Sequence, residues 1–216
     1  TPSYSSTSLN DDDKVKLVVT SNELCITTSA VTSNEVTFTV GTAVTPIVSI
    51  SEDANSVCPG TPVTYTATPT NGGTASYKWF VGTTEQSETS ESFTYSPSNG
   101  DVVKSEMTTS LTCVTGSIAT SNQVTMVVNP SLTPSVSISE STNSICSGEN
   151  VTFTATSTNE GTTPVYDWLV NNVSTGETSA SYSSTALTNG DKVKVILTSS
   201  EACVLGTATS SEIVMS

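Results

Sequence analysis

The stretch Val151-Thr152-Phe153-Thr154-Ala155-Thr156 alternates strictly between apolar and hydroxyl side chains. Because residues two apart on a β-strand point to the same face, this pattern predicts a strand with one buried and one solvated face. Nearly the same six residues, Val63-Thr64-Tyr65-Thr66-Ala67-Thr68, occur 88 positions earlier. The chain therefore contains an internal repeat whose unit includes β-strands.

Other motifs recur in the same order and extend the repeat over the whole chain. The recurring pairs are Ser56-Val57-Cys58 with Ser144-Ile145-Cys146, Tyr77-Lys78-Trp79 with Tyr166-Asp167-Trp168, Asn99-Gly100-Asp101 with Asn189-Gly190-Asp191, and Cys113 with Cys203. The period is about 89 residues. Ser3-Tyr4-Ser5-Ser6, Asp13-Lys14-Val15-Lys16 and Cys25 fall in the same register two periods before the last repeat. We therefore expect only the last strands of a repeat in 1–43, and whole repeats in 44–130 and 131–216.

Apolar alternation predicts five strands in the last repeat, near residues 136–138, 151–155, 166–170, 193–197 and 213–215. Turn residues separate them, and helical periodicity is almost absent, which indicates antiparallel sheets. A unit of about 89 residues with one central Trp is typical of an immunoglobulin-like sandwich. The expected fold class is therefore all-β, with tandem immunoglobulin-like antiparallel β-sandwich repeats. The aromatic side chains expected in the cores are Tyr65, Tyr77, Trp79, Phe153, Tyr166 and Trp168.

One run of motifs between Pro134 and Cys203 is similar to a known family. The order Pro-x-Val-Ser-Ile-Ser, Ile-Cys-x-Gly-x-x-Val-Thr-Phe-Thr-Ala-Thr, Tyr-x-Trp, Asn-Gly-Asp and a late Cys resembles the PKD-like or Ig-like repeats of giant Bacteroidota cell-surface proteins, gliding-motility adhesins among them. The Trp-Asp-Phe-Gly-Asp-Gly motif of true PKD domains is absent, and Trp168-Leu169-Val170-Asn171 stands in its place. The resemblance implies an outer-membrane-associated, extracellular filament that depends on secretion and gliding machinery. Other regions of that filament would contact an extracellular surface or polysaccharide.

The five cysteines indicate disulfides, because a repetitive chain that looks exported meets an oxidising environment. Pairing within repeats would join Cys58 to Cys113 and Cys146 to Cys203. In a sandwich, however, these loops lie at opposite poles, roughly 25 Å apart for strands of about eight residues, whereas a disulfide needs Cα atoms within about 7 Å. Head-to-tail stacking would instead bring Cys203 to Cys58. We therefore prefer an inter-repeat Cys58–Cys203 bond, with the partners of Cys25 and Cys113 upstream of this sequence and the partner of Cys146 in a following repeat.

The charge and residue content argue against several classes of function. The net charge is −14, with six Lys, no Arg and no His, which disfavours nucleic acid as a partner. No apolar stretch is long enough for membrane insertion in this fragment. A Ser–His–Asp or Cys–His arrangement cannot be assembled without His, so we expect no enzyme. Asp11, Asp12 and Asp13 offer ligands for Ca²⁺, but they replace the Asn-Gly-Asp turn of the other repeats. We therefore expect a solvated turn without a cofactor.

The repeats predict a structural role, a stalk or shaft segment whose immediate partners are the neighbouring repeats of the same chain. Two alternatives stay open. The loops Gly82–Glu91 and Asn171–Ser179 differ between repeats, as they would in a module that binds carbohydrate or another ligand. The chain could also be an accessory stalk of a secreted enzyme.

Overall fold

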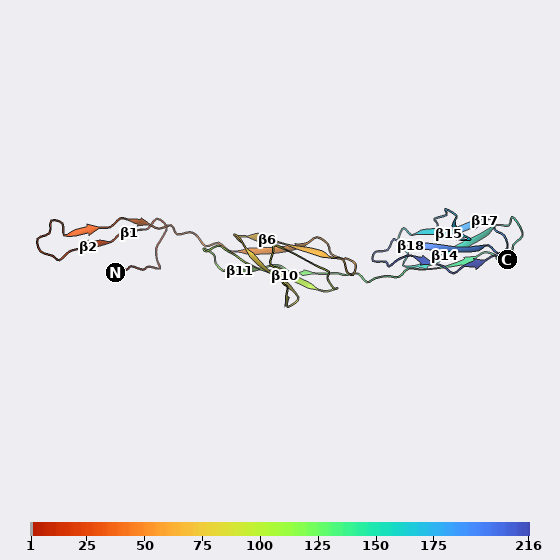
Figure 1. The fold of residues 1–216 in the computed structure, drawn as a ribbon, viewed down its shortest axis with the longest axis horizontal. Helices are drawn as coiled ribbons and strands as arrows, with labels where there is room; N and C mark the ends of the chain where they lie inside the picture. The colour runs from red at the N-terminus through yellow and green to blue at the C-terminus, as the bar shows by residue number, and fades with distance from the viewer. Residues whose placement is uncertain (1) are drawn as a thin grey trace.

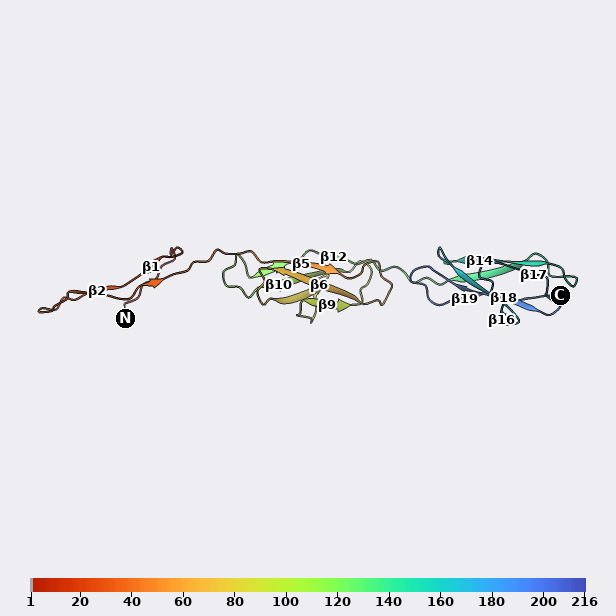
Figure 2. The same ribbon diagram turned by 90° about the horizontal axis from the view of Figure 1, so that it is seen from above.

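The structure is a computed structural model that describes residues 2–216. Three β-rich units follow one another along a single axis, a hairpin at the N-terminal end and then two sandwiches (Figures 1 and 2). All strand pairs within the units are antiparallel, so the predicted all-β immunoglobulin-like fold is confirmed. The described residues include no helix that is long and apolar enough to cross a membrane.

Residues 131–216, here called repeat 3, form a sandwich of two sheets. The first sheet has the order β13 (Ser135–Glu140), β14 (Val151–Thr158), β17 (Ser181–Ser184). The second has the order β16 (Val173–Ser174), β15 (Val165–Val170), β18 (Lys192–Thr198), with β19 (Ala208–Thr209) and β20 (Ile213–Val214) both paired to β18. The alternation predicted five of these strands. It did not predict β16, β17 or β19, because they are short and carry few apolar side chains.

Residues 44–130, here called repeat 2, have the same topology. The first sheet has the order β5 (Ile47–Glu52), β6 (Val63–Thr70), β9 (Ser92–Tyr95). The second has the order β8 (Thr84–Glu85), β7 (Ser76–Val81), β10 (Val102–Thr108), with β11 (Ile118–Thr120) and β12 (Val124–Thr125) paired to β10. The sequence repeat is therefore a structural repeat, strand for strand.

Each sandwich is closed around one tryptophan. Trp168 is fully buried and packs against Phe153 and Tyr182, with ring centroids 6.1 and 5.9 Å away. Its indole N–H donates a hydrogen bond to the Ser179 carbonyl at 2.9 Å, so the one polar atom of the ring is satisfied. Trp79 is equally buried and donates in the same way to the carbonyl of Ser90. The other four aromatic side chains expected in the cores, Tyr65, Tyr77, Phe153 and Tyr166, are also buried.

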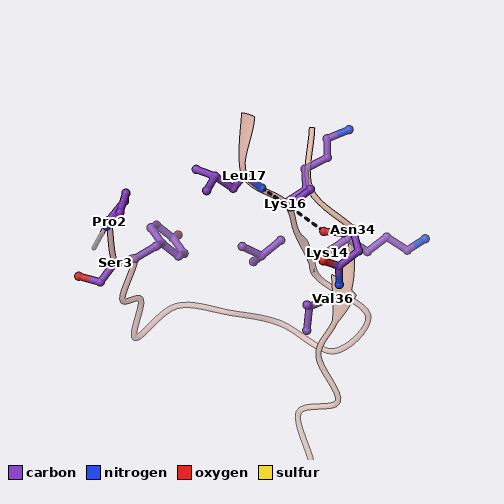
Figure 3. Close-up of a pocket in the computed structure, with 10 residues that line it drawn as sticks. Pro2, Ser3, Lys14, Lys16, Leu17, Asn34 and Val36 are labelled. Carbon is purple, nitrogen blue, oxygen red and sulfur yellow. Dashed lines mark hydrogen bonds between the residues drawn. The ribbon is translucent and has the colours of Figure 1, made fainter. Parts of the chain in front are cut away.

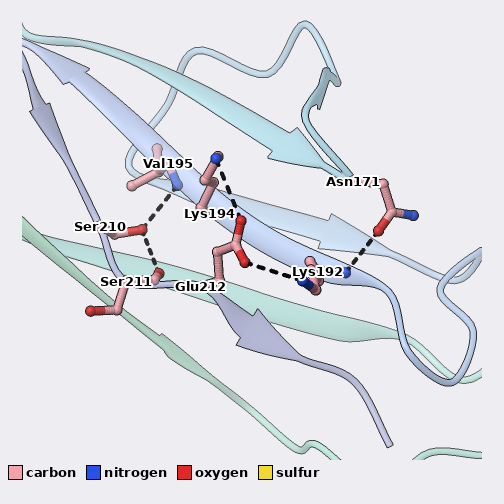
Figure 4. Close-up of polar contacts among 7 residues, drawn as sticks. All are labelled: Asn171, Lys192, Lys194, Val195, Ser210, Ser211 and Glu212. Carbon is pink, nitrogen blue, oxygen red and sulfur yellow. Dashed lines mark hydrogen bonds and ion pairs between the residues drawn. The ribbon is translucent and has the colours of Figure 1, made fainter.

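A serine side chain lies between the last two short strands of each unit, as Figure 4 shows for Ser210 of repeat 3. The Ser210 hydroxyl accepts a hydrogen bond from the Val195 N–H at 3.0 Å and donates to the next carbonyl, so it takes a place in the ladder between β19 and β20. On the solvated face of the sheet, the ammonium groups of Lys192 and Lys194 lie 3.8 and 3.5 Å from the Glu212 carboxylate. The serine contact recurs between Ser121 and Ser105 and between Ser33 and Leu17.

The N-terminal unit consists of four short strands. Its first two together correspond to β18, the third corresponds to β19, and the fourth corresponds to β20. Its pairs are β1 (Lys14–Val15) with β4 (Val36–Thr37), and β2 (Val18–Thr20) with β3 (Ala30–Thr32). The hydrogen bond from the Phe38 N–H to the Asp13 carbonyl, 2.9 Å, matches those from Met126 to Asp101 and from Met215 to Asp191. The hairpin therefore keeps the backbone arrangement that β18, β19 and β20 have in a complete repeat.

The inner face of this hairpin is open to solvent. Leu17 is 51% and Val19 55% exposed, whereas the corresponding Val195 and Leu197 of repeat 3 are fully buried. Tyr4, which corresponds to the stacked Tyr182, is 73% exposed. Figure 3 shows the hollow on this face, about 610 Å³ in volume, with Leu17 among its lining residues. Its lining also includes Tyr4, whose counterpart Tyr182 stacks on Trp168 in repeat 3.

Candidate functional site at the junction between repeats

A disulfide joins repeat 2 to repeat 3. Cys58, in the loop before β6, bonds Cys203, in the loop between β18 and β19, with an S–S length of 2.02 Å and a Cα–Cα distance of 5.2 Å. This is the inter-repeat pair preferred from the sequence. The alternative pairs within the repeats are not formed, and Cys25, Cys113 and Cys146 are free and exposed.

The end of repeat 2 runs beside the loop that carries Cys58. The Val57 N–H donates to the Val127 carbonyl at 3.1 Å, and the Asn129 N–H donates back to the Val57 carbonyl at 2.9 Å. Val57 and Val128 thus form a parallel bridge. The Asn129 side-chain amide adds a hydrogen bond to the carbonyl of Ser56 at 3.2 Å. The linker is therefore fixed to repeat 2 as far as residue 129.

Three residues later the linker is fixed to repeat 3. The Leu132 N–H donates to the Cys203 carbonyl at 3.0 Å, and the Leu205 N–H donates to the Leu132 carbonyl at 2.9 Å. Only Pro130 and Ser131 lie between the two bonded stretches, and Pro fixes its own φ. The linker, the disulfide and both loops therefore form one connected junction instead of a flexible tether.

An asparagine in each repeat holds the start of the first strand. The Asn159 side-chain amide donates to the Thr133 carbonyl at 2.9 Å, and Asn71 donates to the Thr45 carbonyl at 2.8 Å. Both asparagines have a positive φ, a conformation that Asn tolerates better than most residues. Sequence reasoning missed this pair, although the recurrence of Asn71 at position 159 could have identified it.

The backbone beside Cys113 makes the same two hydrogen bonds to the linker as the backbone beside Cys203, although Cys203 has a positive φ of 62° and Cys113 does not. The Val44 N–H donates to the Cys113 carbonyl at 3.1 Å, and the Thr115 N–H donates to the Val44 carbonyl at 3.0 Å. This is the arrangement of Leu132 around Cys203. The Cys113 thiol lies 3.3 Å from the Gly41 carbonyl oxygen and is exposed, so it faces the linker on the side where a preceding repeat would present its own loop.

Cys146 occupies the same setting as Cys58. The Glu149 N–H donates to the Cys146 carbonyl at 3.0 Å, as the Thr61 N–H donates to the Cys58 carbonyl at 3.1 Å. A glycine with positive φ follows two positions after each cysteine and shapes both turns alike. The thiol of Cys146 is thus presented at the C-terminal end of repeat 3 as Cys58 is at the end of repeat 2.

The acidic run in the first unit forms a turn. The Asp13 carboxylate accepts the Asn10 N–H at 2.6 Å, and the Asp11 carboxylate accepts the Val40 N–H at 2.9 Å. Asp12 takes a positive φ of 65° at the tip. Within residues 2–216, no three acidic or cysteine side chains gather in a way that could hold a metal ion. Two of the three candidate calcium ligands therefore bond the backbone.

The corresponding turn of repeat 3 shows the same use of an aspartate. Hydrogen bonds from the Thr188 N–H, at 2.7 Å, and from the Asn171 side chain lower the pKa of Asp191 from its ordinary value. Both donors favour the ionised carboxylate. The aspartate of the Asn-Gly-Asp motif is thus a structural residue that closes a turn between strands.

The loops that differ between repeats are short hairpins on the side of each sandwich. β15 and β16 are joined by Asn171-Asn172, both with positive φ, and β7 and β8 by Gly82-Thr83. Beside the disulfide an open hollow of about 640 Å³ lies between the Cys58 loop, the turn 96–99 and the linker 128–130. Its lining of Pro, Gly, Ser, Asn and Val includes no aromatic or charged side chain. The predicted core aromatics are unavailable for sugar stacking, since all are buried.

Comparison with known proteins gives only a distant likeness. No protein-family model matches the chain, and no curated protein matches it. Among solved structures, the chain is similar to the full ectodomain (Ig1–Ig3) of mouse nectin-like molecule 4, with 15% sequence identity and a TM-score of 0.31. The match covers 80% of this chain and 64% of that one, less than two thirds of its length. The immunoglobulin-like assignment therefore rests on the strand order and cores of the chain itself.

Proposed function

We propose that this chain is a segment of the stalk of a long extracellular filament built from repeats. The observation that carries this proposal is the junction between repeats 2 and 3. There, a linker bonded on both sides and the Cys58–Cys203 disulfide connect two complete sandwiches. Each sandwich has its own core, so the junction serves to connect rather than to complete a fold.

A connection of this kind favours a load-bearing spacer. In repeat proteins each unit contacts mainly its neighbours, so the stiffness of the whole depends on the junctions. Gly- and Ser-rich linkers behave as flexible coils. Here the backbone bridges at Val57 and Leu132 and the disulfide restrain bending and rotation. Adding equivalent repeats would then extend a rod.

The chemistry of the chain supports a place outside the cell. Disulfides persist in oxidising environments such as the cell surface. The net charge of −14 keeps neighbouring filaments apart. The resemblance to Bacteroidota surface repeats supports a role in surface adhesion and gliding. The proposed role is non-catalytic and needs no cofactor, since it follows from the shape and linkage of the repeats.

Residual dipolar couplings test the rigidity on which the proposal depends. In the oxidised protein, we expect the amide couplings of residues 44–130 and 131–216 to fit one common alignment tensor. In the Cys58→Ser, Cys203→Ser double variant we expect two tensors of different magnitude, because the junction keeps only its hydrogen bonds. Serine at Cys25, Cys113 and Cys146 is the matched control and should leave the single tensor unchanged. Two independent tensors in the oxidised protein would reject the stalk.

A further inference from the structure

The disulfide changes which parts of the chain carry tension. We propose that inter-repeat disulfides of the Cys58–Cys203 kind divide the filament into two covalent rails joined by rungs. The rails carry tension, while the rungs, which are the bodies of the sandwiches, carry none. This inference rests on the proposed function as a stalk and adds how the stalk bears load.

The first rail is visible in the structure. Cys58 and Cys203 are separated by 145 positions in sequence but by only 5.2 Å between Cα atoms. When the chain is pulled at its ends, the shortest covalent path reaches Cys58, crosses the disulfide and continues from Cys203. Residues 59–202, which contain both tryptophans, lie off this path. Tension on the chain therefore bypasses most of each core, and only edge strands such as β5, with the buried Val48 and Ile50, and β19, with the buried Ala208, stay on the path.

What remains on the path is the first and last strands of the repeats. Between Cys25 and Cys58 the rail consists of β3, β4, the linker and β5, and after Cys203 it continues as β19 and β20. Extended strands already rise about 3.3 Å per residue, close to the maximum reach of a chain. The strands of the rail therefore have little slack to release.

The second rail is the segment from Cys113 to Cys146, which contains β11, β12, the linker and β13. It has the same length as the first, 33 positions in each case. Its two ends are free thiols, and the backbone hydrogen bonds beside them are those of the bonded pair, with Cys113 matching Cys203 and Cys146 matching Cys58. In an array, Cys113 would bond the preceding repeat and Cys146 the following one, so the two rails alternate along the filament.

Each of these further bonds is an ordinary oxidation of two thiols. The sulfur atoms form one S–S bond and lose two protons and two electrons. The electron acceptor is another disulfide, of a small molecule or of a thiol–disulfide oxidoreductase, which is reduced to two thiols by exchange. The exposure of Cys113 and Cys146 allows this exchange to reach them.

Such a ladder separates the strength of the filament from the stability of its folds. A domain of this size is stable by only about 5–15 kcal/mol, and a body in the load path would unfold and lengthen the filament. A body that is a rung can unfold and refold without changing the contour length between the ends. The filament then transmits force through covalent bonds and pre-extended strands.

Single-molecule stretching of the whole chain between handles at its two ends tests the first rail. We expect the oxidised protein to reach full extension roughly 500 Å earlier than the Cys58→Ser, Cys203→Ser variant, since the disulfide removes 145 residue steps of about 3.5 Å. We also expect the unfolding events that release the length of a whole repeat only in the variant. Serine at Cys25, Cys113 and Cys146 should leave the oxidised behaviour unchanged.

A second measurement uses the native sequence and so does not depend on the folding of the Cys58→Ser, Cys203→Ser variant. Oxidised molecules are held under a force that prevents refolding, and a thiol reductant is added to the buffer. They should then lengthen by the same 500 Å. Equal extension of oxidised and reduced molecules would overturn the load path. A shorter oxidised contour together with two alignment tensors in solution would reject the stiff stalk but keep the load path, so the two failures are distinguishable.

Duplicating residues 128–216 after Ser216 tests the second rail, because Ser216 corresponds to Val127 and the copy then begins with the linker. The added repeat supplies a second copy of the Cys203 hairpin directly after the loop of Cys146. Non-reducing peptide mapping of the oxidised protein should find Cys146 bonded to that copy. Cys146 left as a free thiol, with Cys58–Cys203 intact, would overturn the two-rail arrangement.

Discussion

Replacing Cys58 and Cys203 together by serine is expected to lower the free energy of unfolding of repeat 3 by about 4 kcal/mol. With the disulfide intact, unfolded repeat 3 stays tied to repeat 2 at both ends, by the linker at Leu132 and by the bond to Cys203. These ties close a loop of about 70 residues, which removes conformational entropy from the unfolded chain. Urea denaturation followed by the amide NMR signals of residues 131–216 measures the change.

The matched control is a second double variant with the same number of cysteine-to-serine changes. Serine at Cys113 and Cys146 together should leave the denaturation midpoint where it is, because neither residue is bonded in this chain. Identical midpoints for the native protein and the Cys58→Ser, Cys203→Ser variant would contradict the role given to the disulfide.

Trp168→Ala is expected to destabilise repeat 3 by about 3–5 kcal/mol. The indole is fully buried against Phe153 and Tyr182, and its removal leaves a cavity and an unpaired carbonyl at Ser179. A loss of this size is a large part of the stability of a single domain. Circular dichroism should show that about half of the sandwich structure melts at a lower temperature.

The variant also reports on the independence of the repeats. Trp79 is then the remaining tryptophan, so fluorescence follows repeat 2 alone. Since the two cores share no residue, the Trp79 transition should stay close to its native position. The reciprocal variant Trp79→Ala should shift repeat 2 and spare repeat 3. Loss of both repeats in either variant would show that they fold as one unit.

The cores could be predicted from the sequence because their signal is in side chains. Val193, Val195 and Leu197 alternate with polar residues, and all three are fully buried in β18. In repeat 2 the middle position is Ser105, which is also buried; its hydroxyl donates to the Lys78 carbonyl and its N–H donates to Ser121. Alternation alone would have scored this residue as a break in the strand, and the match between repeats corrects it.

The restraint of the linker could not be predicted in the same way. The hydrogen bonds at Val57 and Leu132 use backbone groups, which every residue type supplies, so they leave no trace in composition. The hydrogen bond from the Asn159 side-chain amide to the Thr133 carbonyl depends on a positive φ, which the identity of a single residue does not predict. The pairing of the cysteines could be predicted from the sequence because it depends only on which pole of a sandwich each loop occupies.

The bond between Cys58 and Cys203 is the observation on which both the stalk and the load path depend. Digestion of the oxidised protein after its acidic residues, under non-reducing conditions and with free thiols first alkylated, followed by mass spectrometry, tests it most directly. The expected result is one crosslinked pair of peptides containing Cys58 and Cys203, with alkylated Cys25, Cys113 and Cys146. A crosslinked pair containing Cys146 and Cys203 would contradict the junction described above, because it would confine each disulfide to a single repeat.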